Sequence, residues 1–396
     1  MWPYRVAMFG QRRVELAVTR PTQVVIAGGG VGAWETAFAL RALAADSLAL
    51  TLITPATEFA YRPVAVLEPF VGAPARRLSL ARLASEVQAD VIHDRVVAID
   101  PGRQTVATAG GDEITFNHCV IAVGARTQAV QNGTIAIDVA HPEASLAPVL
   151  EAIDRGSASR VGFQAVQPTW PLPAYELALL TRRHARDRGR APAIVLITEE
   201  KQPLAPFGEA VRETVTRLLA EADIELRHAA GPAALRAAVS DLEVVLALPR
   251  LRGPDIAGVP LDADGFVPVS AYGQVADLEG VYAVGDATAF PLKFGGVAAL
   301  QADAVASTIA AAVGALPAPR PCRGLIEGVL LTGGDPGLLH LALSIGPAGV
   351  ADGRITAESV GGRWSGEAKL AARYLGAYLD QLWAQGPAWR LAADTA

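Results

Sequence analysis

The chain has 396 residues, of which 51% are hydrophobic and only 19% are charged, and its formal net charge is −6. This length fits two domains or one elaborated α/β unit, and the composition predicts a large buried core. A negative net charge argues against nucleic acid as a partner. The two cysteines, Cys119 and Cys322, are too few for a disulfide framework, which fits a reducing, cytoplasmic compartment.

The first 21 residues are interpreted as an extension of unknown role. They contain arginines but no continuous apolar stretch, so a secretory signal is not expected. The chain has no uninterrupted run of about 20 apolar residues, and a membrane-spanning helix is therefore not expected either. No metal site is expected.

A short apolar strand, three glycines and a helix follow one another in the run QVVIAGGGVGAWE at residues 23–35. Such a turn brings unpaired backbone N–H groups and the positive end of a helix dipole to one point, where a pyrophosphate can bind. In the fingerprint G-x-G-x-x-G/A, Gly28 makes the turn, Gly30 lets the backbone approach the phosphates, and Ala33 keeps the helix close to the strand. The alternative is a glycine turn without a ligand. The predicted contacts in this turn are Gly28, Gly29, Gly30 and Val31.

The surroundings of the turn favour a dinucleotide site. A helix at residues 33–44 and a strand at residues 47–53 complete a βαβ unit. A carboxylate usually ends the second strand and binds the ribose hydroxyls, but Thr54 occupies that place here. Either the Thr54 hydroxyl or Glu58 could take over this contact.

Two further segments approach the predicted crevice. Arg62 begins a loop at the carboxyl end of a strand, where it could bind a cofactor phosphate or a substrate anion, or could simply be solvated. The backbone at Val96 or Val97, in a strand at residues 94–99, could lie against an adenine.

After two meander strands, an apolar strand at residues 118–123 ends on A-V-G-A, which again brings backbone without bulky side chains close to a nucleotide. The contacts expected there are Ala122 and Gly124, whereas Cys119 is expected in the core.

A third motif, LEGVYAVGDATAF at residues 278–290, completes the set. With QVVIAGGGVGAWE and the strand ending in AVGA, it follows the order seen in flavoproteins with two dinucleotide domains. From residue 22 to about residue 390, the chain resembles the pyridine nucleotide-disulfide oxidoreductase superfamily, in particular its branch of sulfide:quinone oxidoreductase and type II NADH dehydrogenase. The resemblance implies bound FAD, with Gly285 and Asp286 at the ribitol. The alternative is that Asp286 only caps the next helix.

The resemblance also implies the fold class, which is α/β with two Rossmann-like, glutathione-reductase-type dinucleotide-binding domains and a C-terminal cap. The FAD domain is expected to be discontinuous, because the GD motif lies far from the first glycine turn. The expected division is residues 1–21 for the extension, 22–145 and 268–320 for the FAD domain, 146–267 for a second Rossmann-like domain and 321–396 for the cap.

The second domain departs from its relatives at the turn where type II NADH dehydrogenases bind NADH. Residues 164–173 read QAVQPTWPLP and contain no glycine. Three prolines remove three donors, and the bulk of Trp170 opposes close approach of a pyrophosphate. NADH is therefore not expected to bind in the usual way. Glu199 and Glu200 end a strand of this domain and are interpreted as solvated or capping carboxylates.

The chain also lacks the cysteines that sulfide chemistry requires. When the segment PAYE at residues 173–176 is matched to the sulfide:quinone oxidoreductases, Trp170 stands at the place of one family cysteine. A second has no counterpart at residues 127–142, and Cys322 near the third cannot run a disulfide relay alone.

Lys293 and Gly296 follow the GD motif and precede an apolar helix expected at residues 298–313. The family fold implies that this helix points its N-terminus at the flavin pyrimidine, where Lys293 would favour the anionic reduced flavin. An exposed lysine is the alternative.

The C-terminal part contains an amphipathic helix expected at about residues 366–383. Trp364, Trp383 and Trp389 suit a membrane interface, but they suit a core or a dimer interface equally well. In the resembling families this region covers the flavin and forms the quinone pocket.

The sequence therefore predicts a cytoplasmic FAD-dependent oxidoreductase that passes electrons from an unknown donor to a quinone-like acceptor. Peripheral contact with the inner face of the membrane and a homodimer are both open. Two alternatives are retained. One is an NAD(P)H-dependent flavin reductase or dehydrogenase, and the other is a non-catalytic flavoprotein that binds a partner.

Overall fold

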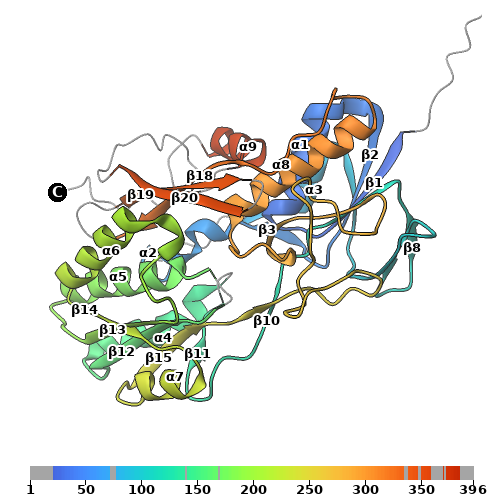
Figure 1. Cartoon of the computed structure of the whole chain (residues 1–396). Coiled ribbons are helices and arrows are strands. Elements are labelled where there is room, and N and C mark those ends of the chain that lie inside the picture. The colour runs from blue at the N-terminus through green and yellow to red at the C-terminus, as the bar shows by residue number, and fades with distance from the viewer. Residues whose placement is uncertain are drawn as a thin grey trace, which may run out of the picture.

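Figure 1 gives the computed structural model of the chain, which describes residues 21–71, 77–138, 141–167, 170–333, 338–346, 349–357, 369 and 372–383. Its first sheet has five parallel strands in the order β17-β9-β1-β2-β5. The short strand β17 comes from late in the chain and joins strands from the first third. The strands are β1 (Thr22–Ala27), β2 (Leu48–Ile53), β5 (Ala89–Ile92), β9 (His118–Ile121) and β17 (Val281–Ala283).

Helices α1 (Val31–Ala44) and α8 (Gly295–Ala312) pack against each other on this sheet. α8 is rich in alanine and is buried along most of its length, which explains its apolar sequence on all sides. Among the described helices, it is the one whose length and composition meet the test for a membrane span. Because 72% of that span is buried inside the protein, α8 is a core helix here.

Smaller elements surround the first sheet. The expected meander is present as an antiparallel sheet of β6 (Val96–Asp100), β7 (Thr105–Thr108) and β8 (Glu113–Thr115). The expected loop after residue 61 contains short helices. The remaining elements of this region are η1 (Ala45–Ser47), β3 (Glu58–Ala60), η2 (Arg62–Leu67), α2 (Glu68–Val71), β4 (Arg77–Ser79) and α3 (Leu80–Val87).

The second sheet is also parallel, with the order β11-β15-β12-β13-β14. Its apolar strands are buried, as expected for a sheet covered by helices. The strands are β11 (Ile135–Ala136), β12 (Arg160–Ala165), β13 (Ala193–Thr198), β14 (Ile224–His228) and β15 (Val244–Leu248). The helices are α4 (Pro142–Arg155), α5 (Leu172–Asp187), η3 (Ala205–Phe207), α6 (Glu209–Glu221) and α7 (Pro232–Val239).

Two connecting segments join the part that contains the first sheet to the part that contains the second. The strands β10 (Arg126–Thr127) and β16 (Leu251–Arg252) pair antiparallel, and Arg126 forms an ion pair with Asp255 at 3.1 Å. The strand β11 already belongs to the second sheet, ahead of the division expected after residue 145. The domain boundaries therefore remain a proposal, and we propose to begin the second domain before β11.

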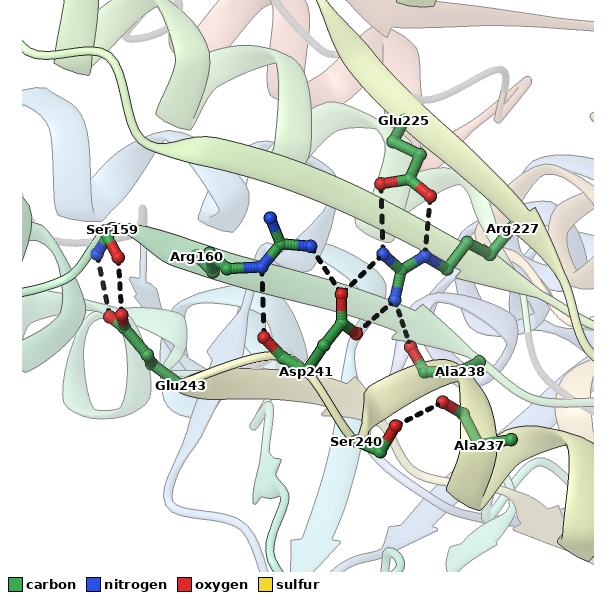
Figure 2. A network of polar contacts seen from close by, with 9 residues as sticks. All are labelled: Ser159, Arg160, Glu225, Arg227, Ala237, Ala238, Ser240, Asp241 and Glu243. Carbon is green, nitrogen blue, oxygen red and sulfur yellow. Dashed lines mark hydrogen bonds and ion pairs between the residues drawn. The ribbon is translucent and has the colours of Figure 1, made fainter.

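A network of ion pairs ties together the amino-terminal end of β12 and neighbouring parts of the second sheet (Figure 2). Asp241 accepts hydrogen bonds from Arg160 and from Arg227, at 2.5 Å and 2.6 Å. Arg227 also donates to Glu225 at 2.8 Å. The network therefore fastens β14 to the segment that leads into β15 and holds neighbouring parts of the sheet together.

The C-terminal part forms an antiparallel sheet of β18 (Gly324–Leu331), β19 (Leu338–Gly346) and β20 (Gly349–Ala357), followed by α9 (Leu375–Leu382). The buried Glu176 of α5 fastens this part to the second domain, because it accepts the Leu331 N–H at 3.0 Å and pairs with Lys369.

The C-terminal helix is shorter than the sequence predicted. Residues 369 and 372–374 are not helical, and α9 begins at Leu375, where Glu35 binds its first N–H groups. Trp383 packs edge-on against Tyr61 with ring centroids 4.9 Å apart, so this tryptophan contributes to the core. Trp364, Trp389 and residues 1–20 lie outside the described residues.

Candidate cofactor site

The first glycine turn lies where three parallel strands end. Gly28 has φ +136°, and a Cβ at this position would lie 2.1 Å from the Ala122 carbonyl oxygen. The Gly28 N–H donates to the Ile53 carbonyl at 2.8 Å, and the Ala122 N–H donates to the Ala27 carbonyl at 2.7 Å. Only glycine fits at Gly28, because its conformation and its close contact both exclude a side chain.

The rest of the turn forms the beginning of α1. A Cβ at Gly29 would lie 2.6 Å from the Thr54 hydroxyl oxygen, whereas a Cβ at Gly30 would meet nothing within 4 Å. Gly30 is the N-cap of α1 and Val31 is its first residue, and no side chain caps this end. The turn therefore opens a space beside the positive end of a 14-residue helix.

Thr54 occupies the place of the missing carboxylate. Its side chain is only 2% exposed, and its hydroxyl accepts the Ala56 N–H at 3.2 Å. Glu58, the alternative for the ribose contact, is exposed on β3. Thr54 is thus the nearer of the two to the glycine turn, through its contact with Gly29.

The GD motif forms the short helix η4 (Gly285–Ala287) directly after β17. Gly285 has φ +72°, and its N–H donates to the Gln301 side chain at 2.7 Å. The Gln301 amide also donates to the Thr288 hydroxyl at 3.2 Å. Gln301 thus fixes the GD turn from α8. The sequence reasoning missed this residue, although an amide in the middle of an apolar helix was a signal.

Asp286 lies in a charged environment at the centre of this site. Burial raises the pKa of its carboxyl, and the charges of Lys293 and Arg62 oppose that shift. Among the described residues, no hydrogen bond to the Asp286 carboxylate is present. The structure therefore brings together three predicted site residues, with Arg62 on the exposed side of η2.

Lys293 is buried, not solvated, with only 4% of its surface exposed. Its Nζ donates to the Thr288 carbonyl and lies 3.6 Å from the centroid of the Phe266 ring. Burial lowers the pKa of Lys293 to about 8, although the charges of Asp286, Asp262 and Asp264 oppose that shift. The alternative of an exposed lysine is thereby excluded.

The N-terminus of α8 lies beside these charges and starts at Gly295, earlier than expected. A Cβ at Gly296 would lie 2.6 Å from Ile326 of β18, so glycine lets the helix approach this strand. Phe294 precedes the helix and stacks on Trp170. The ring centroids are 4.3 Å apart and the rings are inclined by 17°.

The remaining predicted contacts lie around the first sheet. Gly124 has φ +71°, and a Cβ there would meet nothing within 4 Å, so open space adjoins this backbone. The Val97 carbonyl accepts the Ala257 N–H at 2.9 Å. This bond ties β6 to the segment that returns from the second domain, and the contact of Val97 with an adenine stays a prediction.

The carboxylates at the end of β13 bind groups within the protein and are not simply solvated. Glu199 accepts the Gln167 N–H at 2.8 Å and pairs with Arg250 at 2.8 Å. Glu200 accepts the Tyr175 hydroxyl at 3.0 Å. Glu199 therefore fastens the altered turn itself.

Both cysteines are free and buried. Burial raises the pKa of the Cys119 thiol to about 12 and that of Cys322 to about 11. Neither thiol forms a thiolate at neutral pH, and a thiolate is the form that attacks sulfur.

The fold and the site define a protein of the two-dinucleotide-domain class. Residues 22–140 match the family model of pyridine nucleotide-disulphide oxidoreductases. The sulfide-quinone reductase of Aquifex aeolicus is 27% identical over 216 residues, which cover 51% of this chain and 49% of that protein. The matched part thus spans about half of this relative. The two matches agree with the predicted resemblance to this superfamily.

Solved structures confirm the predicted fold. The sulfide:quinone oxidoreductase of Aquifex aeolicus superposes with a TM-score of 0.69 at 21% identity, covering 92% of this chain and 91% of that one. A putidaredoxin reductase in complex with putidaredoxin gives 0.58 at 17% identity and covers 82% and 81%. A ferredoxin reductase from Rhodopseudomonas palustris gives 0.60 at 16% identity and covers 81% and 82%.

The residues of the site fit the FAD that this family implies. Open space adjoins the backbone at Gly30 and Gly124, as an extended dinucleotide requires. The Asp286 carboxylate, raised in pKa and without a hydrogen bond among the described residues, suits a ribitol hydroxyl. The positive charges of Arg62 and Lys293 lie near the Asp286 carboxylate and would compensate the charge of a bound pyrophosphate.

Proposed function

We propose that this chain transfers electrons through FAD to a quinone-like acceptor, from a donor other than NADH and without a cysteine relay. The observation that carries this proposal is the stack of Trp170 on Phe294. Trp170 lies in the turn after β12, where the relatives that use NADH have a glycine turn. The stack connects this turn with the N-terminus of α8. Phe207 adds a third ring, 5.7 Å from Trp170, so the approach from the second domain is closed by aromatic rings.

The thiol chemistry of the sulfide-quinone reductases is not proposed for this chain. Trp170 stands where a family cysteine is expected, and the two cysteines present are buried in the thiol form. A small reductant other than sulfide, such as a quinol, fits the remaining chemistry.

The acceptor site that we propose is a cavity of about 280 Å³ beside the N-terminal half of α8. Its lining combines apolar side chains with two charged groups, which suits a quinone ring with its two carbonyl oxygens. The lining residues that matter are Gly296, Leu300, Asp303, Leu325, Ile326 and Arg373. The name of the relative from Aquifex aeolicus supports a quinone as the acceptor.

When bound, FAD supplies the electron-transfer chemistry, and the chain positions it. The turn at Gly28 would hold its pyrophosphate, and the carboxylate of Asp286 would bind its ribitol. We propose that Lys293, together with the N-terminus of α8, stabilises negative charge on the reduced ring. Replacing Lys293 with Met is then expected to lower the flavin potential, and an unchanged potential would remove this role.

We further propose a cytoplasmic protein with peripheral contact at the inner face of a membrane, where a quinone dissolves. The face of α9 that carries Tyr378 packs on the core, because the ring centroids of Tyr378 and Phe38 lie 5.0 Å apart. We therefore expect the membrane contact on the opposite, outer side of the C-terminal part.

The experiment that tests the function is an anaerobic absorption spectrum before and after addition of NADH, followed by a chemical reductant and then a short-chain quinone. We expect a flavin band that NADH leaves intact and that the quinone restores after chemical reduction. Rapid bleaching by NADH would favour a NAD(P)H-dependent reductase instead. Failure of every donor and acceptor, with a partner retained in pull-down, would favour a non-catalytic flavoprotein.

A further inference from the structure

Two carboxyl groups face each other between the helices that frame the candidate site. Glu35 of α1 is fully buried, and its two oxygens accept the N–H groups of Tyr374 and Leu375, at 2.9 Å and 2.6 Å. Asp303 of α8 lies next to Glu35 and interacts with it electrostatically. Two adjacent buried carboxyls are not both charged, because like charges repel strongly away from water, so this pair holds one proton between two groups.

The proton belongs mainly to Asp303. Two backbone donors stabilise the charged form of Glu35, whereas Asp303 receives no such support. The Oδ1 atom of Asp303 is buried, and no hydrogen-bond partner for it exists among the described residues. Asp303 also lines the cavity beside α8. A protonated carboxyl therefore borders the space that we assign to the acceptor.

We propose that Asp303 donates a proton to the acceptor in this cavity, and that Glu35 positions it and keeps it protonated. This proposal rests on the proposed function. Reduction of a quinone to a hydroquinone takes up two electrons and two protons. Oxidation of the anionic reduced cofactor releases both electrons and one proton, and the second proton comes from Asp303. After this transfer both Glu35 and Asp303 are deprotonated, and Asp303 then takes up a proton from solvent, which completes the cycle.

The charges around the pair agree with this role. Burial and the neighbouring Glu35 raise the pKa of Asp303 to about 8, while Arg373 and Arg320 oppose that shift. Burial also raises the pKa of Glu35. Cys322 and Tyr374, the other titratable groups that face Asp303, stay neutral at pH 7 because burial raises the pKa of each. Asp303 thus carries a proton at neutral pH, and it can take up a new proton at that pH after it has donated one.

The test uses the FAD-loaded protein, reduced chemically under anaerobic conditions and mixed with one of two acceptors. A water-soluble quinone needs protons, whereas ferricyanide takes electrons alone. We expect Asp303→Asn to slow reoxidation by the quinone about 10²-fold, the lower range for loss of a general acid, and to leave reoxidation by ferricyanide unchanged. Asp90→Asn, a change at an exposed carboxylate on β5, serves as the matched control and is expected to alter neither rate.

A second readout does not depend on turnover. Infrared difference spectra of the wild-type protein across pH 6 to 10 are expected to contain the carbonyl band of a protonated carboxyl that disappears near pH 8. Asp303→Asn should lack this band. If Asp303→Asn does not fold, the Asp303→Glu variant and the infrared titration of the wild-type protein test the proposal instead.

The outcomes separate the two proposals. Equal reoxidation of Asp303→Asn and wild type by the quinone, or no titrating carboxyl in the wild type, would overturn the role of Asp303. A wild-type protein that ferricyanide reoxidises and no quinone does would overturn the proposed function itself.

Discussion

The indole of Trp170 lies nearly parallel to the ring of Phe294, with their centroids 4.3 Å apart and an inclination of 17°. Trp170 follows β12 of the second sheet in sequence, and Phe294 immediately precedes α8, which packs on the first sheet. This aromatic contact therefore links the turn after β12 to the N-terminus of α8, and the proposed loss of an NADH site rests on it.

The energy of this contact can be measured by a double-mutant cycle. Trp170→Ala is expected to lower the free energy of unfolding by about 2 kcal/mol, since the ring is only partly buried. Its coupling with Phe294→Ala should be about 1 kcal/mol, as for stacked aromatic pairs. Urea unfolding of the two single variants and the double variant gives these values. Strictly additive effects would show that the stack contributes nothing of its own.

Opening the stack is not expected to restore reduction by NADH. The Trp170→Ala variant still lacks the glycine turn that a pyrophosphate requires, and Glu199 still fastens the loop. The flavin band of this variant should therefore remain after anaerobic addition of NADH. Rapid bleaching in Trp170→Ala alone would mean that the indole by itself blocks the nicotinamide.

A pair of glycine substitutions separates folding from cofactor binding in the first turn. Gly28→Ala places a Cβ at 2.1 Å from the Ala122 carbonyl oxygen, at a φ of +136°, so this variant should lose stability and FAD together. Gly30→Ala meets nothing within 4 Å and should fold normally but bind FAD more weakly, because its methyl group points into the ligand space. The measurements are thermal unfolding of the apoprotein and the flavin content after purification. Equal loss of stability in both variants would contradict this assignment.

The sequence was most informative where a local pattern carries the chemistry. The glycine run before α1 and the GD motif after β17 each predicted a turn from a few adjacent residues, and both turns are present at the carboxyl ends of strands of the first sheet. The strand AIVLIT and the helix after residue 172 were predicted for the same reason, because their periodicity is local.

Contacts between distant residues could not be predicted in this way. Gln301 and Gly285, or Glu35 and Asp303, meet only because α1, β17 and α8 pack side by side. A polar residue inside an apolar helix indicates that a partner exists, but it does not name that partner. The start of α9 was missed for a related reason, since Glu35 fixes it from the other end of the chain.

The titration of Lys293 predicts how stability depends on pH. The folded protein lowers the pKa of this side chain from 10.5 to about 8, so between these values the unfolded state binds more protons. Stability attributable to Lys293 therefore rises as the pH increases from about 8 to about 10.5. Lys293→Met should remove this rise, whereas Lys201→Met, at an exposed position, should retain it. Parallel curves for wild type and Lys293→Met in urea unfolding would contradict the burial of a charged amine.

The cysteines are expected to be inert in the native protein. Because burial raises the pKa values of Cys119 and Cys322 to about 12 and about 11, the thiolate fraction at pH 8 is very small and neither sulfur is accessible. Treatment with iodoacetamide followed by mass spectrometry should find both thiols free in the native protein and both alkylated in urea. Fast native labelling of Cys322 would reopen a role for it in the reaction.

The ion-pair network of Figure 2 predicts how the second domain responds to acid. Hydrogen bonds from Arg227 and then Arg160 hold the pKa of Asp241 well below its usual range. The stability that this carboxylate contributes is present above its unfolded pKa of about 3.9 and is lost as the pH falls through the folded value. Asp241→Asn should therefore flatten the acid limb of the stability curve, and added salt should reduce the difference from wild type, since these groups are exposed to solvent. Urea unfolding between pH 2 and pH 6 measures this effect, with Asp90→Asn as the control for loss of a surface carboxylate. If Asp90→Asn and Asp241→Asn shift the acid limb equally, net charge is responsible and the geometry of the network is not.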